Sequence, residues 1–327
     1  MRVVITGGSG FVGSNLISNL RNSGIDVRNL DVRPSPWHND ITIRRDITKS
    51  LEVAEIGDCD SIVHLAAVHR DDVTPKSLYH DVNVTGTENV VAFAEKRNVK
   101  KIVFFSSVAV YGFAEPGAGE DAETRPFNEY GSTKLQAETI LKDWSAKSLD
   151  RSLTIIRPTV IFGPRNRGNV FNLMNQIWKK RFLKVGSGEN VKSLAYIDNV
   201  VGFATFALKL EKTGVRTFNY VDAPELKVND MVDLMAATMG KPLSRIRVPM
   251  LLAKTGAAVF DLLSIITGRK FPISRIRIKK FAAETSFSSA VRATGYLPKK
   301  SVREGILETI DYEFLKMPED NVVFDTE

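Results

Sequence analysis

The sequence predicts an α/β fold in which a doubly wound parallel sheet is followed by a smaller C-terminal domain. The first half of the 327-residue chain alternates short apolar β runs with stretches of helical periodicity, and this alternation is typical of a parallel sheet. The predicted strands span residues 2–6, 27–31, 41–45, 61–66, 101–105 and 153–158. The clearest helical stretches span residues 13–23, 77–97 and 129–148. Strands 61–66 and 101–105 are almost wholly apolar, as central parallel strands should be.

The first strand runs into a glycine-rich turn, "TGGSGFVG", that opens the first helix. Gly7, Gly10 and Gly13 have the spacing G-x-x-G-x-x-G, which allows a tight turn and a close approach of the backbone to a pyrophosphate. The helix that follows, beginning near Phe11 and Val12, directs its amide groups and the positive end of its dipole at that pyrophosphate. Because the turn lies between a strand and a helix, we interpret it as a dinucleotide-binding site.

The second strand ends in a carboxylate, Asp31, within "LDVRP". A carboxylate at this position accepts hydrogen bonds from an adenosine ribose and repels a 2′-phosphate. Arg33 is a competing signal because its guanidinium can pair with such a phosphate. We expect NAD as the cofactor, with NADP as the alternative.

The stretch "YGSTK" places Tyr130 and Lys134 one helical turn apart, on the same face. A neighbouring ammonium and an oxidised nicotinamide ring favour the phenolate, so Tyr130 can accept a proton from a substrate hydroxyl. Ser106 and Ser107 follow the strand 101–105 at the sheet edge where such folds bind ligands. A serine hydroxyl there can donate to a developing carbonyl oxygen.

With these motifs the chain resembles the extended short-chain dehydrogenase/reductases, in the nucleotide-sugar epimerase/dehydratase group. The matching segments are "TGGSGFVG", "LDVRP", "RRDI", "HLAA", "NVTGTENV", "SSVAVYG", "YGSTK" and "RPTVIFGPR". The resemblance implies a Rossmann-like sheet with a C-terminal substrate-binding domain. It also implies a catalytic set formed by Ser107, Tyr130, Lys134 and Asn83.

The same resemblance implies which further residues contact the two ligands. The implied cofactor contacts, beyond the glycine turn, Asp31 and Arg33, are Asp46, Ile47, Leu65, Ala66, Ala67, Ser106, Tyr130, Lys134 and Pro158. The implied substrate contacts are Ser107, Val108, Tyr130, Arg165, Asn169 and Lys192. Arg165 and Lys192 are expected to pair with the diphosphate or another anion of the substrate.

The resemblance also narrows the choice of reaction type. Relatives that eliminate water across C5 and C6 carry Asp-Glu after the catalytic hydroxyl, whereas this chain has Val108 and Ala109, which cannot move a proton. We therefore expect an NAD-dependent C4 epimerase of a nucleotide-diphospho sugar, acting through a 4-keto intermediate. The alternatives are an NAD(P)H-dependent 4-keto-sugar reductase, a steroid or flavonoid reductase, and a sensor or scaffold without turnover.

The expected domain plan places the dinucleotide-binding domain at residues 1–165, with residues 190–218 returning to it. Residues 166–189 and 219–317 are expected to form the substrate domain, and residues 318–327 an acidic, frayed tail. The helices at 77–97 and 129–148 are expected to form a homodimer through a four-helix bundle.

Composition narrows the remaining possibilities. The single cysteine, Cys59, allows no intrachain disulfide, the four histidines lack metal-ligand spacing, and no leader pattern is visible, so we expect a cytoplasmic protein without a metal. The net charge of +7 gathers in the C-terminal third, but no nucleic-acid motif accompanies it. The apolar stretch 249–267 contains two charges and favours a buried or amphipathic helix over a span. Together with the basic run 275–280 it leaves peripheral membrane contact open.

Overall fold

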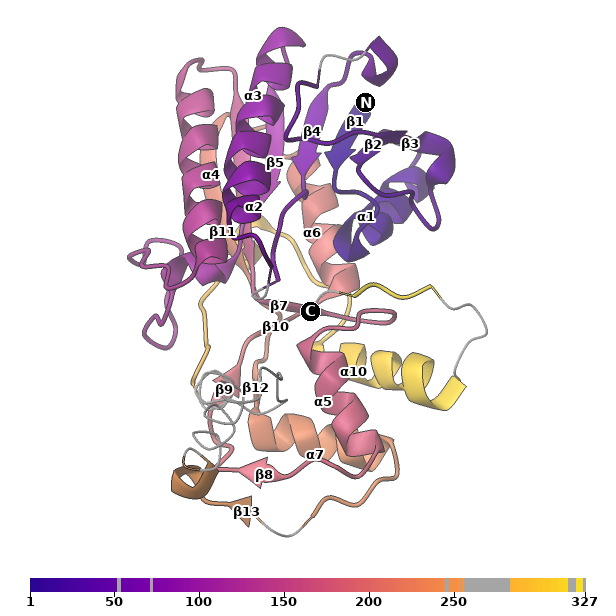
Figure 1. Ribbon diagram of the computed structural model, residues 1–327, viewed down its shortest axis with the longest axis vertical. Coiled ribbons are helices and arrows are strands. Elements are labelled where there is room, and N and C mark those ends of the chain that lie inside the picture. The colour runs from indigo at the N-terminus through magenta and orange to yellow at the C-terminus, as the bar shows by residue number, and fades with distance from the viewer. Residues whose placement is uncertain are drawn as a thin grey trace.

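The computed structural model describes residues 1–51, 54–70, 73–244, 247–253, 255, 283–316 and 322–325. Seven parallel strands form its central sheet in the order β11-β6-β5-β4-β1-β2-β3 (Figure 1). In that order they are β11 (Gly214–Tyr220), β6 (Ser152–Pro158), β5 (Lys101–Phe105), β4 (Ser61–His64), β1 (Arg2–Thr6), β2 (Asp26–Asp31) and β3 (Thr42–Arg44). The strand order reverses between β1 and β4, and ligands of such sheets bind beyond the carboxyl ends of the strands at that point.

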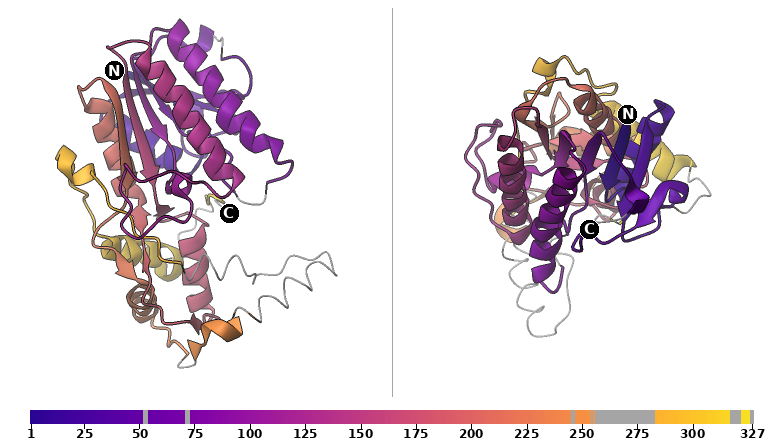
Figure 2. Two further views of the ribbon diagram at one scale, coloured as in Figure 1. Left: turned by 90° about the vertical axis from the view of Figure 1, so that its left-hand side faces the viewer. Right: turned by 90° about the horizontal axis from the view of Figure 1, so that it is seen from above.

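Helices cover both faces of the sheet because its strands are apolar on both faces. Val3 and Ile5 of β1 pack with α1 (Phe11–Asn22) and α6 (Ile197–Lys209). Val4, between them, points to the opposite face, as the two-residue period of a strand requires. There it packs in the cluster under α3 (Gly86–Lys96) and α4 (Glu129–Ala146), which lie side by side in Figure 2.

The predicted doubly wound sheet is confirmed, and its strands and helices fall close to the predicted ranges. β1 and β5 have the predicted bounds, whereas β3 is shorter than predicted. The predicted helix 77–97 is continuous but changes pitch: α2 (Ser77–His80) leads into a π-helical segment (Asp81–Thr85) and then α3. The last strand, β11, pairs with β6 along its whole length; it lies beyond the part of the chain where the alternating pattern was clear.

A smaller part lies below the carboxyl ends of the sheet strands (Figure 1). The longer helices among its described residues are α5 (Asn169–Trp178), α7 (Val228–Thr238) and α10 (Val302–Ile310). Short two-stranded ladders join its segments: β7 (Val160–Phe162) with β10 (Leu194–Tyr196), β9 (Val191–Lys192) with β12 (Leu226–Lys227), and β8 (Lys184–Val185) with β13 (Arg247–Val248).

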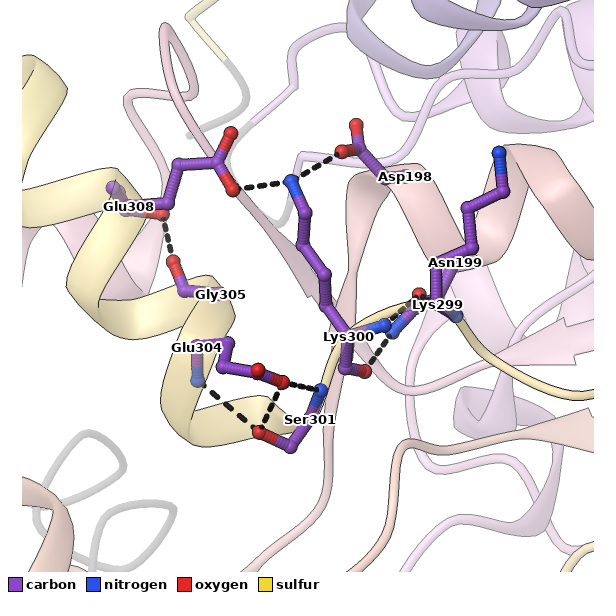
Figure 3. A network of polar contacts seen from close by, with 9 residues as sticks. Asp198, Asn199, Lys299, Lys300, Ser301, Glu304, Gly305 and Glu308 are labelled. Carbon is purple, nitrogen blue, oxygen red and sulfur yellow. Dashed lines mark hydrogen bonds and ion pairs between the residues drawn. The ribbon is translucent and has the colours of Figure 1, made fainter.

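The start of α10 is tied to the start of α6 by a polar network (Figure 3). Ser301 caps α10, and its capping box is closed by Glu304, whose carboxylate accepts from the Ser301 backbone amide at 2.7 Å. The ammonium of Lys300 lies 3.0 Å from the Asp198 carboxylate and also pairs with Glu308. These contacts fix the smaller part against a helix that packs on the sheet.

The C-terminal residues 322–325 are docked, which corrects the expectation that they belong to a frayed tail. The Phe324 amide donates to the Arg165 carbonyl at 2.9 Å. The Phe324 side chain is buried, with its ring 5.8 Å from that of Phe11 and 5.3 Å from that of Trp37. The Phe324 ring, with Val322 also packed against the core, supplies the apolar contact that holds this segment.

None of the described helices is long and apolar enough to cross a membrane. The expected helix at 249–267 is described only at residues 249–253 and 255, and the basic run 275–280 lies outside the described residues.

Candidate active site

The glycine turn after β1 fits a pyrophosphate because two of its glycines allow close backbone approaches. A Cβ on Gly7 would lie 2.6 Å from the Ala66 amide nitrogen, and Gly7 has a φ of +75°. A Cβ on Gly13 would lie 2.4 Å from the Gly8 Cα. A side chain at Gly7 would therefore push the turn away from the loop after β4, and one at Gly13 would push α1 away from the turn.

The first turn of α1 offers the amide groups that such a ligand needs. Gly10 is the N-cap, in an extended conformation and without a side chain to occupy the helix end. The amides of Phe11, Val12 and Gly13 open the helix, where backbone donors have no intrahelical acceptor. This turn and the start of α1 therefore form an anion site facing the carboxyl end of β1.

Asp31 is held in place by its own backbone surroundings. It is buried, and its carboxylate accepts from the Ser9 amide and the Arg33 amide, each at 2.9 Å. The side chain of Arg33 is 67% exposed, and its Nε lies 3.9 Å from Asp31 Oδ1. The carboxylate is thus fixed beside the glycine turn, while the guanidinium is only loosely attached to it. This arrangement fits NAD better than NADP.

The remaining expected cofactor contacts follow the carboxyl ends of the strands. Leu65, Ala66 and Ala67 follow β4, and their side chains are half-buried. Pro158 ends β6 in a buried position. These positions line the carboxyl edge of the sheet across its central strands.

The two positions expected to contact adenine differ in exposure. Asp46 is exposed, and its carboxylate accepts from the Thr48 amide at 2.9 Å. The Ile47 side chain is buried against α3, where a Cβ on Gly86 would lie 2.6 Å from Ile47 Cδ1. Only the backbone of Ile47 is therefore available to a ligand.

The two serines that follow β5 have different partners. Ser106 is buried, and its hydroxyl donates to Glu138 at 2.6 Å. The hydroxyl proton of Ser106 is therefore used within the protein, as is its amide, which donates to the Ile156 carbonyl at 2.7 Å. Ser107 caps the short 3₁₀ turn Val108–Tyr111, and its Oγ accepts from the Ala109 amide at 3.1 Å. Since Oγ is the acceptor in that bond, the Ser107 hydroxyl proton is available to donate elsewhere.

Tyr130 is brought to this turn by a close approach of α4. Asn128 is the N-cap of α4 and accepts from the Gly131 amide at 2.9 Å. A Cβ on Gly131 would lie 2.5 Å from the Ala109 carbonyl oxygen. The absence of a side chain at Gly131 lets the first turn of α4 rest on the turn that follows Ser107. Tyr130 is half-buried beside it.

Lys134 lies one turn further along α4 and is buried. Its ammonium nitrogen lies 4.1 Å from the centre of the Phe104 ring. Burial lowers the pKa of Lys134 to about 7, and the Glu138 carboxylate acts in the opposite direction. The cation is therefore poorly hydrated, so a nearby phenolate or ribose hydroxyl would interact with it strongly.

Asn83, in the π-helical segment, joins three parts of the site. Its Oδ1 accepts from the Val68 amide at 2.8 Å, and its Nδ2 donates to the Val68 carbonyl at 3.0 Å. Nδ2 also lies 3.0 Å from the Thr133 hydroxyl oxygen. Asn83 thus ties the loop after β4 to the catalytic face of α4. π-helical turns are frequent at functional sites.

A buried ion pair beneath the catalytic helix was not predicted from the sequence. Glu138 on α4 accepts from Arg157 of β6 at 2.8 Å and 2.6 Å, and both side chains are almost completely buried. Burial opposes ionisation of Glu138, but the hydrogen bonds from Arg157 and Ser106 prevail and lower its pKa. Arg157 also donates to the Tyr111 hydroxyl at 2.6 Å. Only the positions of Glu138, four residues after Lys134, and of Arg157 in "RPT" signal this pair in the sequence.

The three expected anion and sugar contacts lie in the smaller part. The Arg165 guanidinium lies over the rings of Trp37 and Tyr312 and donates to the Val322 carbonyl at 3.1 Å. Asn169 is exposed at the start of α5. The Lys192 ammonium donates to the Ala283 carbonyl, and burial lowers the pKa of Lys192 to about 8. Neither cation is free in this structure, and their role toward substrate stays a prediction.

Residues 3–220 match the NAD dependent epimerase/dehydratase family. The chain belongs to this family. One relative is an N-acetyl-alpha-D-glucosaminyl-diphospho-ditrans,octacis-undecaprenol 4-epimerase of Escherichia coli O157:H7, which is 44% identical over 99% of both chains. Another is a UDP-glucose 4-epimerase of Vibrio cholerae, 27% identical over 94% of both chains.

Solved structures of this family agree with the fold. A UDP-glucose 4-epimerase of Thermotoga maritima has a TM-score of 0.76 at 21% identity, covering 96% of this chain and 98% of that one. A UDP-glucuronic acid 4-epimerase of Bacillus cereus, in complex with NAD, has a TM-score of 0.74 at 22% identity, covering 95% and 98%. The predictions of the family and of an NAD-dependent enzyme are confirmed. Among the described residues no cluster could hold a metal ion.

Proposed function

We propose that this protein is an NAD-dependent 4-epimerase of a hexose that carries a diphosphate on its anomeric carbon. The observation that carries the proposal is the 44% identity, over 99% of both chains, to a diphospho-sugar 4-epimerase. The structure supports it with Ser107 at the carboxyl end of β5 and with Tyr130 and Lys134 near the start of α4, which rests on the turn that follows Ser107.

In the proposed reaction the protein's residues handle the proton and the oxygen at C4. NAD, when bound, supplies the acceptor and later the donor of the hydride at that carbon. Tyr130 accepts the C4 hydroxyl proton and returns it after the 4-keto sugar has turned over in the site. Ser107 donates to the same oxygen. Lys134, buried beneath, favours the phenolate form of Tyr130.

The turn after β5 favours this reaction over dehydration. Val108 and Ala109 occupy the positions where a dehydratase needs an acid and a base, and both are half-buried at the start of the turn. Neither side chain can exchange a proton with C5 or C6. The chemistry that remains for the site is oxidation and reduction at a single carbon.

For the group beyond the diphosphate, we infer a polyprenol. The relative from Escherichia coli O157:H7 acts on an undecaprenol-linked N-acetylglucosamine and is 44% identical, whereas the UDP-glucose 4-epimerase of Vibrio cholerae is 27% identical. The alignment with the Escherichia coli relative covers 99% of this chain and so includes the smaller part. The nucleotide carrier expected from the sequence is supported by the more distant relative. A nucleotide-linked sugar is therefore the competing substrate in the test.

The test offers the purified protein two substrates with the same sugar: polyprenyl-diphospho-N-acetylglucosamine and UDP-N-acetylglucosamine. The released sugar is separated by chromatography, without added NAD(P)H, and the Tyr130→Phe variant is the matched control. Conversion to the C4 epimer at constant mass supports the proposal. A product that forms only with added NAD(P)H would instead show a reductase. A product lighter by one water would show that Val108 and Ala109 do not prevent dehydration.

We further propose a homodimer formed through α3 and α4, working at the cytoplasmic side of the membrane in polysaccharide assembly. Support for the dimer is the position of these two helices side by side on one outer face of the sheet (Figure 2). Sedimentation velocity tests the dimer, and cell fractionation tests the location. A monomer at micromolar concentration would contradict the proposed homodimer.

A further inference from the structure

The end of the smaller part farthest from the sheet is formed by β8 and β13 (Figure 1). There β8 (Lys184–Val185) pairs in parallel with β13 (Arg247–Val248), with Lys184 opposite Arg247. The segment 179–188 leads from α5 through β8, and the segment 241–253 leads from α7 through β13 into a helical turn. We call the described residues of these two segments the distal tip.

Apolar side chains are exposed at the distal tip. Leu251 is 73% exposed, its neighbour Leu252 is 62% exposed, and Leu183 is 50% exposed. Among the described residues no other two consecutive large apolar side chains are both exposed. Phe182, by contrast, is buried and anchors the segment that presents Leu183. The three leucines therefore present apolar surface to solvent in the part of the chain that the structure describes.

The same segments are strongly cationic. In sequence, residues 179–188 and 241–253 contain no Asp or Glu. Their basic residues, equal in number to the formal net charge of +7 of the whole protein, are Lys179, Lys180, Arg181, Lys184, Lys241, Arg245 and Arg247. Arg245 lies outside the described residues. A surface with exposed leucines among cations matches the interface of a membrane with anionic headgroups.

Neighbouring acids neutralise only part of this charge. Lys184 lies 2.7 Å from the Asp233 carboxylate on α7. Glu189, just after the tip, pairs with Lys227 at 3.0 Å. Arg247 donates to the Gly186 carbonyl at 3.0 Å, which links the two segments of the distal tip. Because the carbonyl is neutral, this bond does not neutralise the positive charge of Arg247.

The cations at the end of α5 are the most exposed. Lys179 is the C-cap of α5, and Lys180 has a φ of +56° as the chain turns back. Lys179, Lys180 and Arg181 are all exposed. The turn thus places three consecutive cationic side chains in solvent, next to the strand that begins after Leu183.

We propose that the distal tip docks on an anionic lipid bilayer, with Leu183, Leu251 and Leu252 entering the headgroup region. This inference rests on the proposed function, since a polyprenyl-diphospho sugar is presented at a membrane. Contact through the tip would hold the smaller part, with its expected anion-binding residues, at the surface from which the substrate projects. A protein partner or a second copy on this surface is the competing occupant.

The direct test is flotation of the full-length protein with phosphatidylglycerol/phosphatidylcholine vesicles and with pure phosphatidylcholine vesicles, without substrate. We expect binding to the anionic vesicles only. Lys179→Gln/Lys180→Gln should lower the partition coefficient about 30-fold, at roughly fivefold for each cation. The control Lys209→Gln/Lys212→Gln removes the same charge from exposed lysines at the end of α6 and should leave binding unchanged.

The leucines are tested separately. Leu251→Ser/Leu252→Ser should lower the partition about tenfold, while Leu149→Ser, at a 97% exposed position beyond α4, should not change it. Equal losses in the tip variants and their controls would show charge attraction without a defined surface and would overturn the proposal. Absence of vesicle binding, or self-association that the tip substitutions abolish, would overturn it too.

A second readout separates this inference from the proposed function. Turnover of the lipid-linked sugar in detergent micelles should be the same for the tip variants and the wild type, whereas turnover of the same sugar in vesicles should fall with binding. If vesicles bind but the lipid-linked sugar is not converted, the proposed carrier is wrong and the docking surface stands. If the sugar is converted but vesicles do not bind, the docking surface is wrong and the epimerase stands.

Discussion

Acid sensitivity of the fold should arise largely from one buried histidine, His64, at the end of β4. Its ring is completely buried, with Nδ1 2.6 Å from the Thr6 hydroxyl oxygen and Nε2 3.0 Å from the Thr87 hydroxyl oxygen. Thr87 uses its proton on the Asn83 carbonyl at 2.6 Å. It must therefore accept from Nε2–H, which leaves Nδ1 to accept from Thr6. The neutral ring satisfies both partners.

Protonation of that ring is unfavourable in the folded state. Burial, together with the charge of nearby Lys134, lowers the pKa of His64 to about 3. The unfolded chain, with a pKa near 6.5, then binds more protons between these two values, so stability falls as the pH falls below 6.5. Each pH unit in this window removes about 1.36 kcal/mol, so roughly 2 kcal/mol is lost at pH 5.

Urea unfolding, followed by circular dichroism at pH 8, 6.5 and 5, measures this loss. His64→Gln keeps an amide that can donate to Thr87 but cannot titrate. Its loss of stability between pH 8 and pH 5 should be smaller than that of the wild type by about 2 kcal/mol. His80→Gln, at an exposed position, is the control and should behave as the wild type does. If the His64 variant and the wild type lose the same stability, the ring does not carry the pH dependence and this reasoning is refuted.

Other substitutions test the site directly. Tyr130→Phe should lower turnover by roughly 10²–10⁴ and retain NAD binding, measured by calorimetry; unchanged turnover would remove Tyr130 from catalysis. Ser107→Ala should lower kcat by about 10²–10³, because one donor to the reacting oxygen is lost. Asp31→Ala should weaken NAD binding by about 1.5–3 kcal/mol and reduce discrimination against NADP; a wild type that prefers NADP would contradict this. Glu138→Gln should reduce the free energy of unfolding by about 3–5 kcal/mol by leaving Arg157 unpaired, and urea unfolding at neutral pH checks it.

The sheet and the catalytic face were predictable because their signals are local. Strand 101–105 and the glycine turn after β1 are read from consecutive residues, and Tyr130 and Lys134 from one helical turn. Each signal fixes a backbone position, and the order of parallel strands then brings those positions to one edge of the sheet. Residues far apart in the sequence can therefore be assigned to one site, because the order of the strands brings them together.

Contacts between side chains distant in sequence were not predictable in the same way. Glu138 and Arg157 face each other only because α4 lies over β6. Phe324 reaches Phe11 across almost the whole chain. In both cases the residue type fits many environments, and only the packed structure selects the partner. The bond from the Ser106 hydroxyl to Glu138 was not predictable for the same reason, since its acceptor lies on α4.

The family match and the relatives identify the catalytic part of the molecule but do not identify the carrier of the sugar. The family match ends at residue 220, so it covers the sheet and the candidate catalytic residues Asn83, Ser107, Tyr130 and Lys134. Relatives with reductase names, such as a 2-alkyl-3-oxoalkanoate reductase of Stenotrophomonas maltophilia at 26% identity, match over 94% of this chain. Similar catalytic machinery thus accompanies different substrates, and the sheet alone cannot specify the carrier of the sugar. Comparing the lipid-linked and nucleotide-linked sugars on the same protein is therefore the measurement that assigns the carrier.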